Sequence, residues 1–281
     1  MAIELQERYS SLVDAKLRYT LVQKNGTVWN TRYEGNPKAG AVKVPVRDTE
    51  ATVAAYDKTT GAEKTTATAS FLTVEVDKDY AVNEIIDSYD AASVPDDIVA
   101  DRLGSAGYSL GLQMNSDATA ELLADGTVMD DTTALTSSTI YAAFVDARTT
   151  LSKNKVPAAG RFALVTPDAM ALLLKSDEFI AASNLGDEVK QSGAIGQIAG
   201  FTVFEDATLD GATTSDGGTV EFIVGHPDWC CRIQEWQVEP RVQDLAGSGS
   251  YIGASAVQGR YIYAHKVTKS ETVLIKSAAA S

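Results

Sequence analysis

The chain contains two cysteines and two histidines, and these are the first candidates for metal or nucleophilic chemistry. Cys230 and Cys231 are adjacent, and an unstrained disulfide between them is not expected because bridged residues need a separation and orientation that neighbours rarely reach. His226 lies close to this pair, but His265 is the only other histidine and no second ligand pair follows at zinc-finger spacing. The sequence therefore predicts two buried thiols and no metal site.

Other patterns resemble catalytic or nucleotide-binding motifs, but each fails on spacing or context. The glycines of Gly247–Gly253 stand one residue too far apart for a dinucleotide loop, and no strand-to-helix unit surrounds them. In Gly253–Val257 a valine stands where a nucleophile elbow needs its second glycine. Adjacent acids such as those at 130–131 are explained by solvated turns. The sequence predicts no catalytic residue, no cofactor and no enzymatic turnover.

Charge narrows the classes of function further. The 281 residues carry 24 Lys and Arg against 38 Asp and Glu, a formal net charge of −14. A protein that grips phosphate backbones needs a basic patch, so a transcription factor or nuclease is disfavoured. The same charge suits a container wall past which a polyanion must slide. No apolar run approaches the roughly 18 residues of a membrane span, and the acidic N-terminus differs from a signal peptide, so we expect an intracellular protein without membrane contact.

The elements that would position any site begin with a helix and an arm. Apolar residues at spacings of three and four predict an amphipathic helix over 5–22, followed by an extended arm over 27–38. Valines alternate at 42, 44 and 46, and apolar residues alternate again at 72, 74 and 76. With a turn signal at Asp57–Gly61, they predict a long β-hairpin over 41–77. Its outer part, 48–70, has few large apolar residues and needs another surface to lie on.

A long helix and a mixed region follow the hairpin. Apolar residues at helical spacing predict a helix over 94–124, and Gly104, Gly107 and Gly111 inside it suggest close backbone packing or a bend. A second helix is expected over 138–151 and a third at Thr166-Pro167. Short strands are expected at 161–166, 201–205, 220–225, 232–239, 259–267 and 272–276. The predicted class is α+β with segregated elements and no βαβ rhythm.

This order of elements resembles the HK97-like capsid fold of tailed bacteriophages. The most specific stretches are 156–167 (VPAAGRFALVTP) and 193–205 (GAIGQIAGFTVFE), which are similar to the axial-domain signature of that family. There a Gly-Arg strand leads to a helix that starts at proline, and a glycine-rich turn enters the next strand. The signature residues are Gly160, Arg161, Pro167, Gly193, Gly196, Gly200 and Phe201.

The resemblance implies domains and contacts. It implies an N-terminal helix and arm (1–40), an extended hairpin or E-loop (41–77), a peripheral domain (78–134 and 255–281) with a spine helix (94–124), and an axial domain (135–254). Contacts between subunits would come from the hairpin residues Arg47, Glu50, Tyr56, Lys58, Glu63 and Lys64. Contacts of the N-terminal arm would come from Tyr9, Leu12, Tyr19 and Trp29.

The implied function is a structural subunit that self-assembles into hexamers and pentamers of an icosahedral head around double-stranded DNA. The implied partners are further copies of the chain, a separate scaffolding protein, portal and head-completion proteins, and DNA held without sequence preference. Assembly is expected in the cytoplasm of the bacterial host and the final location in the virion capsid. Two alternatives remain open at this point: an encapsulin-like protein compartment, and a small hydrolase with the hairpin as a lid.

Overall fold

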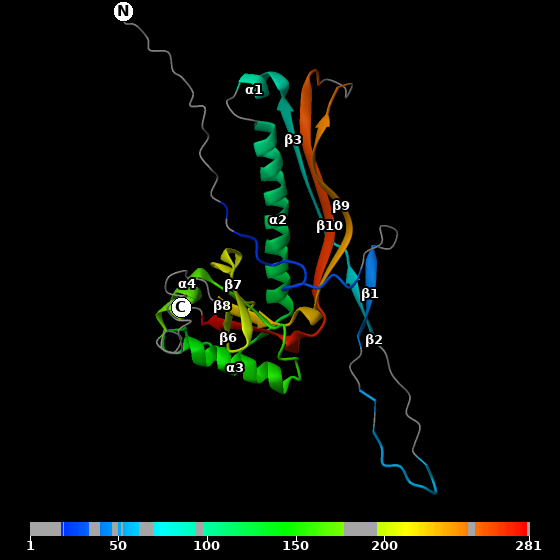
Figure 1. Cartoon of the computed structure of the whole chain (residues 1–281), viewed down its shortest axis with the longest axis vertical. Coiled ribbons are helices and arrows are strands. Elements are labelled where there is room, and N and C mark those ends of the chain that lie inside the picture. Colours follow the sequence, from blue (N-terminus) through cyan, green and yellow to red (C-terminus); the bar gives the residue numbers. More distant parts are fainter. Residues whose placement is uncertain are drawn as a thin grey trace, which may run out of the picture.

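The computed structural model describes residue 18 and residues 20–33, 40–46, 50–51, 53–61, 70–93, 98–176, 196–246 and 251–279. These residues form an elongated α+β molecule with a long helix-backed sheet at one end, a mixed region in the middle and a hairpin that projects at the other end (Figure 1). The described strands form three sheets of two, three and six strands. The α+β class expected from the sequence is confirmed.

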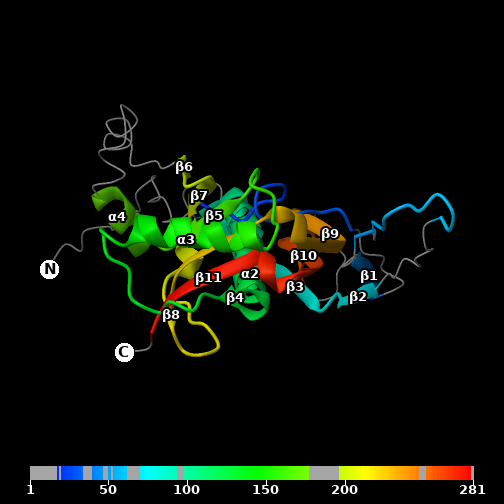
Figure 2. The ribbon, with the colours of Figure 1, turned by 90° about the horizontal axis from the view of Figure 1, so that it is seen from below.

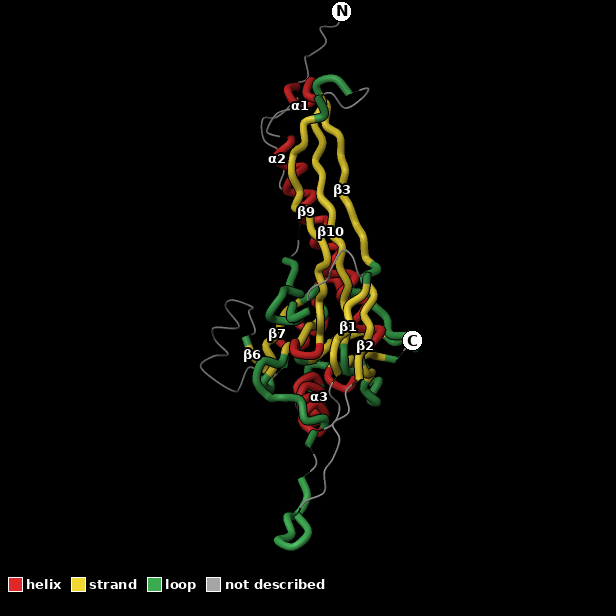
Figure 3. Tube along the Cα trace, turned by 90° about the vertical axis from the view of Figure 1, so that its right-hand side faces the viewer, coloured by secondary structure: helices red, strands yellow, loops and turns green. Residues whose placement is uncertain are grey.

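The helix-backed sheet has three antiparallel strands with a helix along them (Figures 1 and 3). Its strand order is β3-β10-β9, and Leu110 and Met114 of the helix pack against Tyr261 and Tyr263 of the central strand. The elements are β3 (Lys78–Asp87), α1 (Ser88–Ser93), α2 (Ile98–Asp125), β9 (Cys230–Asp244) and β10 (Ala254–Val267).

The middle of the molecule is a six-stranded mixed sheet covered by helices on both faces. Its order is β4-β11-β8-β5-β7-β6. On one face Phe144 of α3 stacks on Phe222 with ring centroids 4.4 Å apart, and Figure 2 shows α3 lying along the sheet. On the other face Ala118 and Leu122 of α2 are buried in the same cluster as Ile275. The elements are β4 (Thr127–Val128), α3 (Ile140–Lys153), β5 (Phe162–Val165), α4 (Pro167–Lys175), β6 (Gln197–Ile198), β7 (Phe201–Glu205), β8 (Thr219–Gly225) and β11 (Val273–Ala278).

The helix α2 therefore serves both sheets. Its first turns cover the three-stranded sheet and its last turns cover the six-stranded one, because apolar residues recur at helical spacing over its whole length. The sequence expected this helix over 94–124, and the structure has it at Ile98–Asp125, with 94–97 outside the described residues.

Strand pairing crosses the domain ranges expected from the sequence. The strand β11 pairs with β8 in the six-stranded sheet and also packs against α2 through Ile275, so the range 255–281 contributes strands to both larger sheets. The strand β9 pairs with β10 in the three-stranded sheet, although 135–254 was expected to be axial. The expected helix over 5–22 lies mostly outside the described residues, and the described residues 18 and 20–22 are not helical.

Candidate functional site

The hairpin of β1 (Ala41–Val46) and β2 (Ser70–Glu75) is anchored to the body at its base. The two strands pair antiparallel, with Val42 opposite Val74. Val44 and Val74 are buried against Ile233 of β9 and Ala264 of β10. The alternating valines thus supply one apolar face, which makes the base of the hairpin part of the subunit's own core.

The described part of the outer hairpin has a turn of its own. Asp57 and Gly61 form an isolated antiparallel bridge, and Gly61 has a φ of 76°. One carboxylate oxygen of Asp57 accepts hydrogen bonds from the backbone N–H groups of Thr59 and Thr60, at 2.6 and 3.0 Å, and these bonds lower the pKa of the carboxyl. Figure 1 shows this segment extending away from the body. The turn expected at Asp57–Gly61 is confirmed.

The hairpin residues expected to contact a neighbour divide into two groups. Glu50, Tyr56 and Lys58 are described and exposed. The side chain of Tyr56 is 75% exposed and that of Val53 is 95% exposed, so the described residues of the subunit leave both uncovered. Three further residues of this set lie outside the described residues: Arg47, Glu63 and Lys64.

Residues 20–33 of the arm cross α2 and reach the junction of the two larger sheets (Figure 1). Trp29 is fully buried, and its indole N–H donates to the Oε1 of Gln23 at 3.1 Å. Asn30 forms a parallel bridge to Cys231, with its N–H donating to the carbonyl of Cys230 at 2.8 Å. Trp29 therefore makes its contacts within its own subunit. Tyr9, Leu12 and Tyr19 lie outside the described residues.

A buried polar network holds this part of the arm. The side-chain amide of Gln23 donates to Thr119 of α2 at 2.6 Å and to the carboxylate of Asp206 at 2.9 Å. Asp206 begins the short 3-10 helix η1 (Ala207–Leu209) and also accepts from the backbone N–H of Thr208 at 3.0 Å. The side-chain amide of Asn115 donates to the Thr208 hydroxyl at 2.9 Å. The arm, α2 and the turn after β7 are thereby joined in the interior.

Arg232 extends the network to the three-stranded sheet. Its guanidinium donates to the Nε2 of His265 at 2.8 Å, to the side-chain oxygen of Asn25 at 2.8 Å and to the carbonyl of Gln23 at 2.9 Å. Burial lowers the pKa of Arg232 to about 10. Burial, with the nearby charge of Arg232, lowers the pKa of His265 to about 2. His265 is therefore a neutral acceptor, and the arm shields the guanidinium from solvent.

This network was not predicted from the sequence. Asn115 and Thr119 stand four positions apart on the buried side of the expected long helix, and such a polar pair in an apolar stripe was the available signal. Gln23, Asp206 and Arg232 carry no local pattern that sets them apart, since they come from three distant segments.

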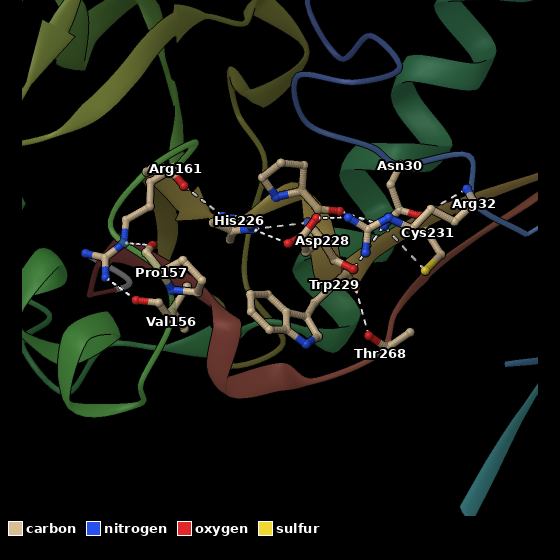
Figure 4. Close-up of polar contacts among 12 residues, drawn as sticks. Asn30, Arg32, Val156, Pro157, Arg161, His226, Asp228, Trp229, Cys231 and Thr268 are labelled. Atoms are coloured by element: carbon tan, nitrogen blue, oxygen red, sulfur yellow. Dashed lines mark hydrogen bonds and ion pairs between the residues drawn. The ribbon is translucent and has the colours of Figure 1, made fainter. Parts of the chain in front are cut away.

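The signature residues of the expected axial domain build turns and anchor them. The buried guanidinium of Arg161 donates to the carbonyls of Val156 and Pro157, at 2.6 and 2.8 Å (Figure 4). It also donates to the Ser152 hydroxyl at 3.2 Å and to the carbonyl of Arg148 at 3.3 Å. Arg161 thus ties the loop before β5 to the end of α3, a structural role.

The remaining signature residues that the structure describes lie at or next to the ends of β5, β6 and β7 in the six-stranded sheet. Gly160 and Gly200 have φ values of 81° and 86°, a region that favours glycine. Pro167 is the first residue of α4, whose N-cap Thr166 accepts from the N–H of Ala169. Phe201 is fully buried. Gly196 precedes β6, and Gly193 lies outside the described residues.

His226 and its neighbours pin the arm to the six-stranded sheet (Figure 4). The Nε2 of His226 lies 2.9 Å from the carbonyl of Ala159, and its Nδ1 accepts from the N–H of Asp228 at 3.2 Å. Asp228 forms an ion pair with Arg32 of the arm, and the Asn30 amide donates to the carbonyl of Pro227 at 2.6 Å. Both ring nitrogens of His226 therefore hold backbone groups.

The other groups considered for chemistry are structural in the same way. Cys230 and Cys231 are buried free thiols, as expected, and burial raises the pKa of both. Thiols in that state are poor nucleophiles. Among the described residues, no group of three or more His, Cys, Asp or Glu side chains is placed to hold a metal ion. No described helix is long and apolar enough to cross a membrane.

The chain is similar to one protein family and to several solved structures. The family model described as phage capsid protein matches residues 84–272. The solved structure of Mycobacterium phage Che8 matches with a TM-score of 0.77 at 17% identity, covering 97% of this chain and 96% of that one. The capsid of Cyanophage P-SCSP1u matches with a TM-score of 0.78 at 14% identity, covering 98% and 93%. The mature capsid of bacteriophage PhiM1 matches with a TM-score of 0.72 at 12% identity, covering 97% and 91%. No curated protein matches the chain.

Proposed function

Because this chain belongs to the phage capsid protein family and is a structural subunit of a capsid shell, we propose that its copies form the hexamers and pentamers of an icosahedral head that encloses double-stranded DNA. The fold shared with solved phage capsids supports the resemblance drawn from the sequence. The family favours neither the protein compartment nor the hydrolase with a lid. The protein belongs in the virion capsid.

The observation that carries the proposal is the projecting hairpin. Its base is buried through Val44 and Val74, while Val53 and Tyr56 in its outer part are exposed to 95% and 75%. A two-stranded hairpin is marginal in water, so the outer part needs a neighbouring surface. We propose that Glu50, Tyr56 and Lys58, together with Arg47, Glu63 and Lys64, contact the next subunit. A symmetric shell repeats each such contact many times.

We propose that the shell subunit has the peripheral and axial domains expected from the sequence. The peripheral domain would contain α2 and the sheet of β3 and β10, and the axial domain would contain α3, α4 and the signature around Arg161. The buried network of Gln23, Asp206 and Arg232 would then keep the two domains in one orientation within a subunit. Expected N-arm contacts at Tyr9, Leu12 and Tyr19 remain proposals for the segment that precedes this network.

Partners beyond the chain itself are also proposals. We propose a separate scaffolding protein, portal and head-completion proteins, and assembly in the cytoplasm of the bacterial host. The formal charge of −14 supports contact with DNA that is weak and independent of sequence, because little positive charge is available for phosphates. We also propose that the subunit has no substrate turnover, since His226 and His265 are engaged in structural hydrogen bonds.

Electron microscopy of particles made by the expressed chain tests the proposal. We expect closed shells or capsomers of five and six subunits, and particles from infected cells should contain duplex DNA. Particles that contain protein cargo and no nucleic acid would favour the compartment instead. A monomer in which Ser255→Ala or His226→Ala abolishes a measured turnover without unfolding would favour the hydrolase.

A further inference from the structure

The buried guanidinium of Arg232 has no carboxylate partner among the described residues. Its side-chain acceptors are all neutral: the Nε2 of His265, the side-chain oxygen of Asn25 and the carbonyl of Gln23, at 2.8, 2.8 and 2.9 Å. Arg232 itself is only 5% exposed. A buried cation is costly unless its hydrogen bonds are satisfied, so this one is stable only while its neutral acceptors stay in place.

Two of these acceptors belong to the arm, and the arm also covers the third. The ring centroids of Trp29 and His265 lie 4.6 Å apart, and the Cζ of Arg232 lies 5.9 Å from the centroid of the Trp29 ring. Figure 1 shows this part of the arm crossing α2. His265 and Arg232 are paired residues of β10 and β9. If the arm segment moved away, water would reach both side chains while the two strands stayed paired.

The contact between the two side chains requires a neutral His265 ring. Its Nε2 accepts from the guanidinium, so the single proton of the neutral ring is on Nδ1. That nitrogen is buried and has no hydrogen-bond partner among the described residues. A second proton on the ring would occupy the Nε2 lone pair, break the bond to Arg232 and place two cations in contact.

The titratable groups around His265 offer a protonated ring no counter-ion. They are Arg232 of β9, Lys78 and Tyr80 of β3, Tyr263 of β10 and Asp117 of α2. The charges of Arg232 and Lys78 act with burial to lower the pKa of His265. The carboxylate of Asp117 accepts from the Tyr263 hydroxyl at 2.8 Å. The arm faces the ring with a neutral indole. Protonation of the docked state is therefore opposed from every side.

We propose that residues 23–30 form an acid-released latch: a proton on His265 detaches this segment of the arm, while α2 and the two larger sheets keep their fold. Once the latch is released, water solvates both cations. Docking of the latch is strongest above about pH 6.5, the ordinary pKa of histidine, and weakens about tenfold for each pH unit below it, because the released state takes up the proton first. The inference concerns the single subunit and is independent of the proposed shell.

Fluorescence of Trp29 tests the latch, because this indole is fully buried while the arm is docked. In the full chain with Trp229→Phe and Trp236→Phe, Trp29 is the only tryptophan left. As the pH falls from neutral, we expect its emission maximum to move to longer wavelength and its quenching by acrylamide to rise several-fold, while far-UV circular dichroism is unchanged. If the emission moves only when circular dichroism is lost, the arm unfolds with the body and the proposal is overturned.

The two histidines of the chain give a matched pair of variants in this background. His265→Gln keeps a neutral acceptor beside Arg232 and takes up no proton, so it should stay docked at the pH where the parent releases. His226→Gln should release as the parent does. An acid shift that persists in His265→Gln would place the sensor elsewhere, for example at Asp206, and would overturn the proposal. A shift abolished only in His226→Gln would overturn it as well.

Asn25→Ala decides the question if His265→Gln does not fold. Asn25 is an exposed residue whose side-chain oxygen accepts from the guanidinium in the docked state. Its removal should weaken docking about tenfold and raise the midpoint of release by about one pH unit. An unchanged midpoint would overturn the latch. None of these outcomes bears on the shell function, which electron microscopy tests separately.

Discussion

The side-chain amide of Gln23 donates a hydrogen bond of 2.9 Å to the carboxylate of Asp206, a residue 183 positions later in the chain. The same amide donates to Thr119 of α2, so one arm residue joins the spine helix to the six-stranded sheet. Buried polar groups that lose a partner are costly. The arm from Gln23 to Asn30 therefore contributes to the interior of the folded subunit. We expect mutations in this segment to lower the stability of the subunit and mutations in the outer hairpin to affect assembly.

Removal of the outer hairpin should affect assembly and spare folding. Replacing Thr49 to Thr66 by a short Gly-Ser linker keeps the core contacts of Val44 and Val74. We expect a soluble subunit with nearly unchanged thermal melting that forms no complete shells under the electron microscope. Val74→Ala is the contrasting control, and it should lower stability by about 2 kcal/mol because it leaves a cavity at the hairpin base. Normal shells from the linker variant would show that the outer hairpin is dispensable.

Removal of the Arg232 guanidinium should weaken the subunit itself. In Arg232→Met the Nε2 of His265 and the carbonyl of Gln23 lose their donor in the interior. We expect a loss of about 3 kcal/mol in the free energy of unfolding, measured by urea denaturation. The control Lys24→Ala changes an exposed arm residue and should alter stability by less than about 0.5 kcal/mol. Equal effects of the two substitutions would contradict the role given to Arg232.

His265 should make stability depend on pH. Its pKa is about 2 in the folded chain and about 6.5 in the unfolded chain, so the unfolded chain binds a proton first as pH falls. Stability from this group is complete above pH 6.5 and decreases from there toward pH 2. Between pH 8 and pH 5 the unmodified chain should lose about 2 kcal/mol more than His265→Gln. Identical pH dependence in both proteins would mean that His265 protonates freely in the folded state.

The glycines of α2 should respond differently to alanine. A Cβ at Gly107 would meet no atom within 4 Å, whereas a Cβ at Gly111 would lie 2.8 Å from the Cδ1 of Leu21 on the arm. Gly107→Ala should therefore stabilise the subunit by up to about 1 kcal/mol through helix propensity. Gly111→Ala should gain less, because the Leu21 side chain must move. Thermal melting of the two variants side by side measures the difference, and a larger gain at Gly111 would show that the arm does not pack there.

Duplex DNA should bind isolated subunits weakly at best. The chain has 14 more acidic than basic side chains, so few cations are available to displace counterions from phosphates. Titration of labelled duplexes at physiological salt should show association that disappears as salt rises and that does not depend on sequence. Tight binding to one sequence, resistant to salt, would contradict a role limited to non-specific contact with packaged DNA.

Several elements were determined by the sequence itself, because their signals are local. Alternating apolar residues over 42–46 and 72–76 predicted β1 and β2, and Thr166 before Pro167 predicted the start of α4. The strand Phe201–Glu205 was predicted with its observed bounds. The strand β3 was missed, although Tyr80, Val82 and Ile86 alternate in it. Glu84 interrupts that pattern, and only the structure shows that it pairs with Arg102 of α2.

The tertiary structure alone decided which segments meet. Local periodicity shows that a segment is a strand, but the choice of its neighbour depends on how the whole chain buries its apolar faces. For that reason β11 joins the six-stranded sheet, and Trp29 of the extended arm is buried in its own subunit. The contacts of Gln23 with Asp206 and of Arg232 with His265 require residues from four segments to be enclosed together. The spacing of residues within one segment cannot predict these contacts. They form only when the packed interior removes the polar groups of all four segments from water.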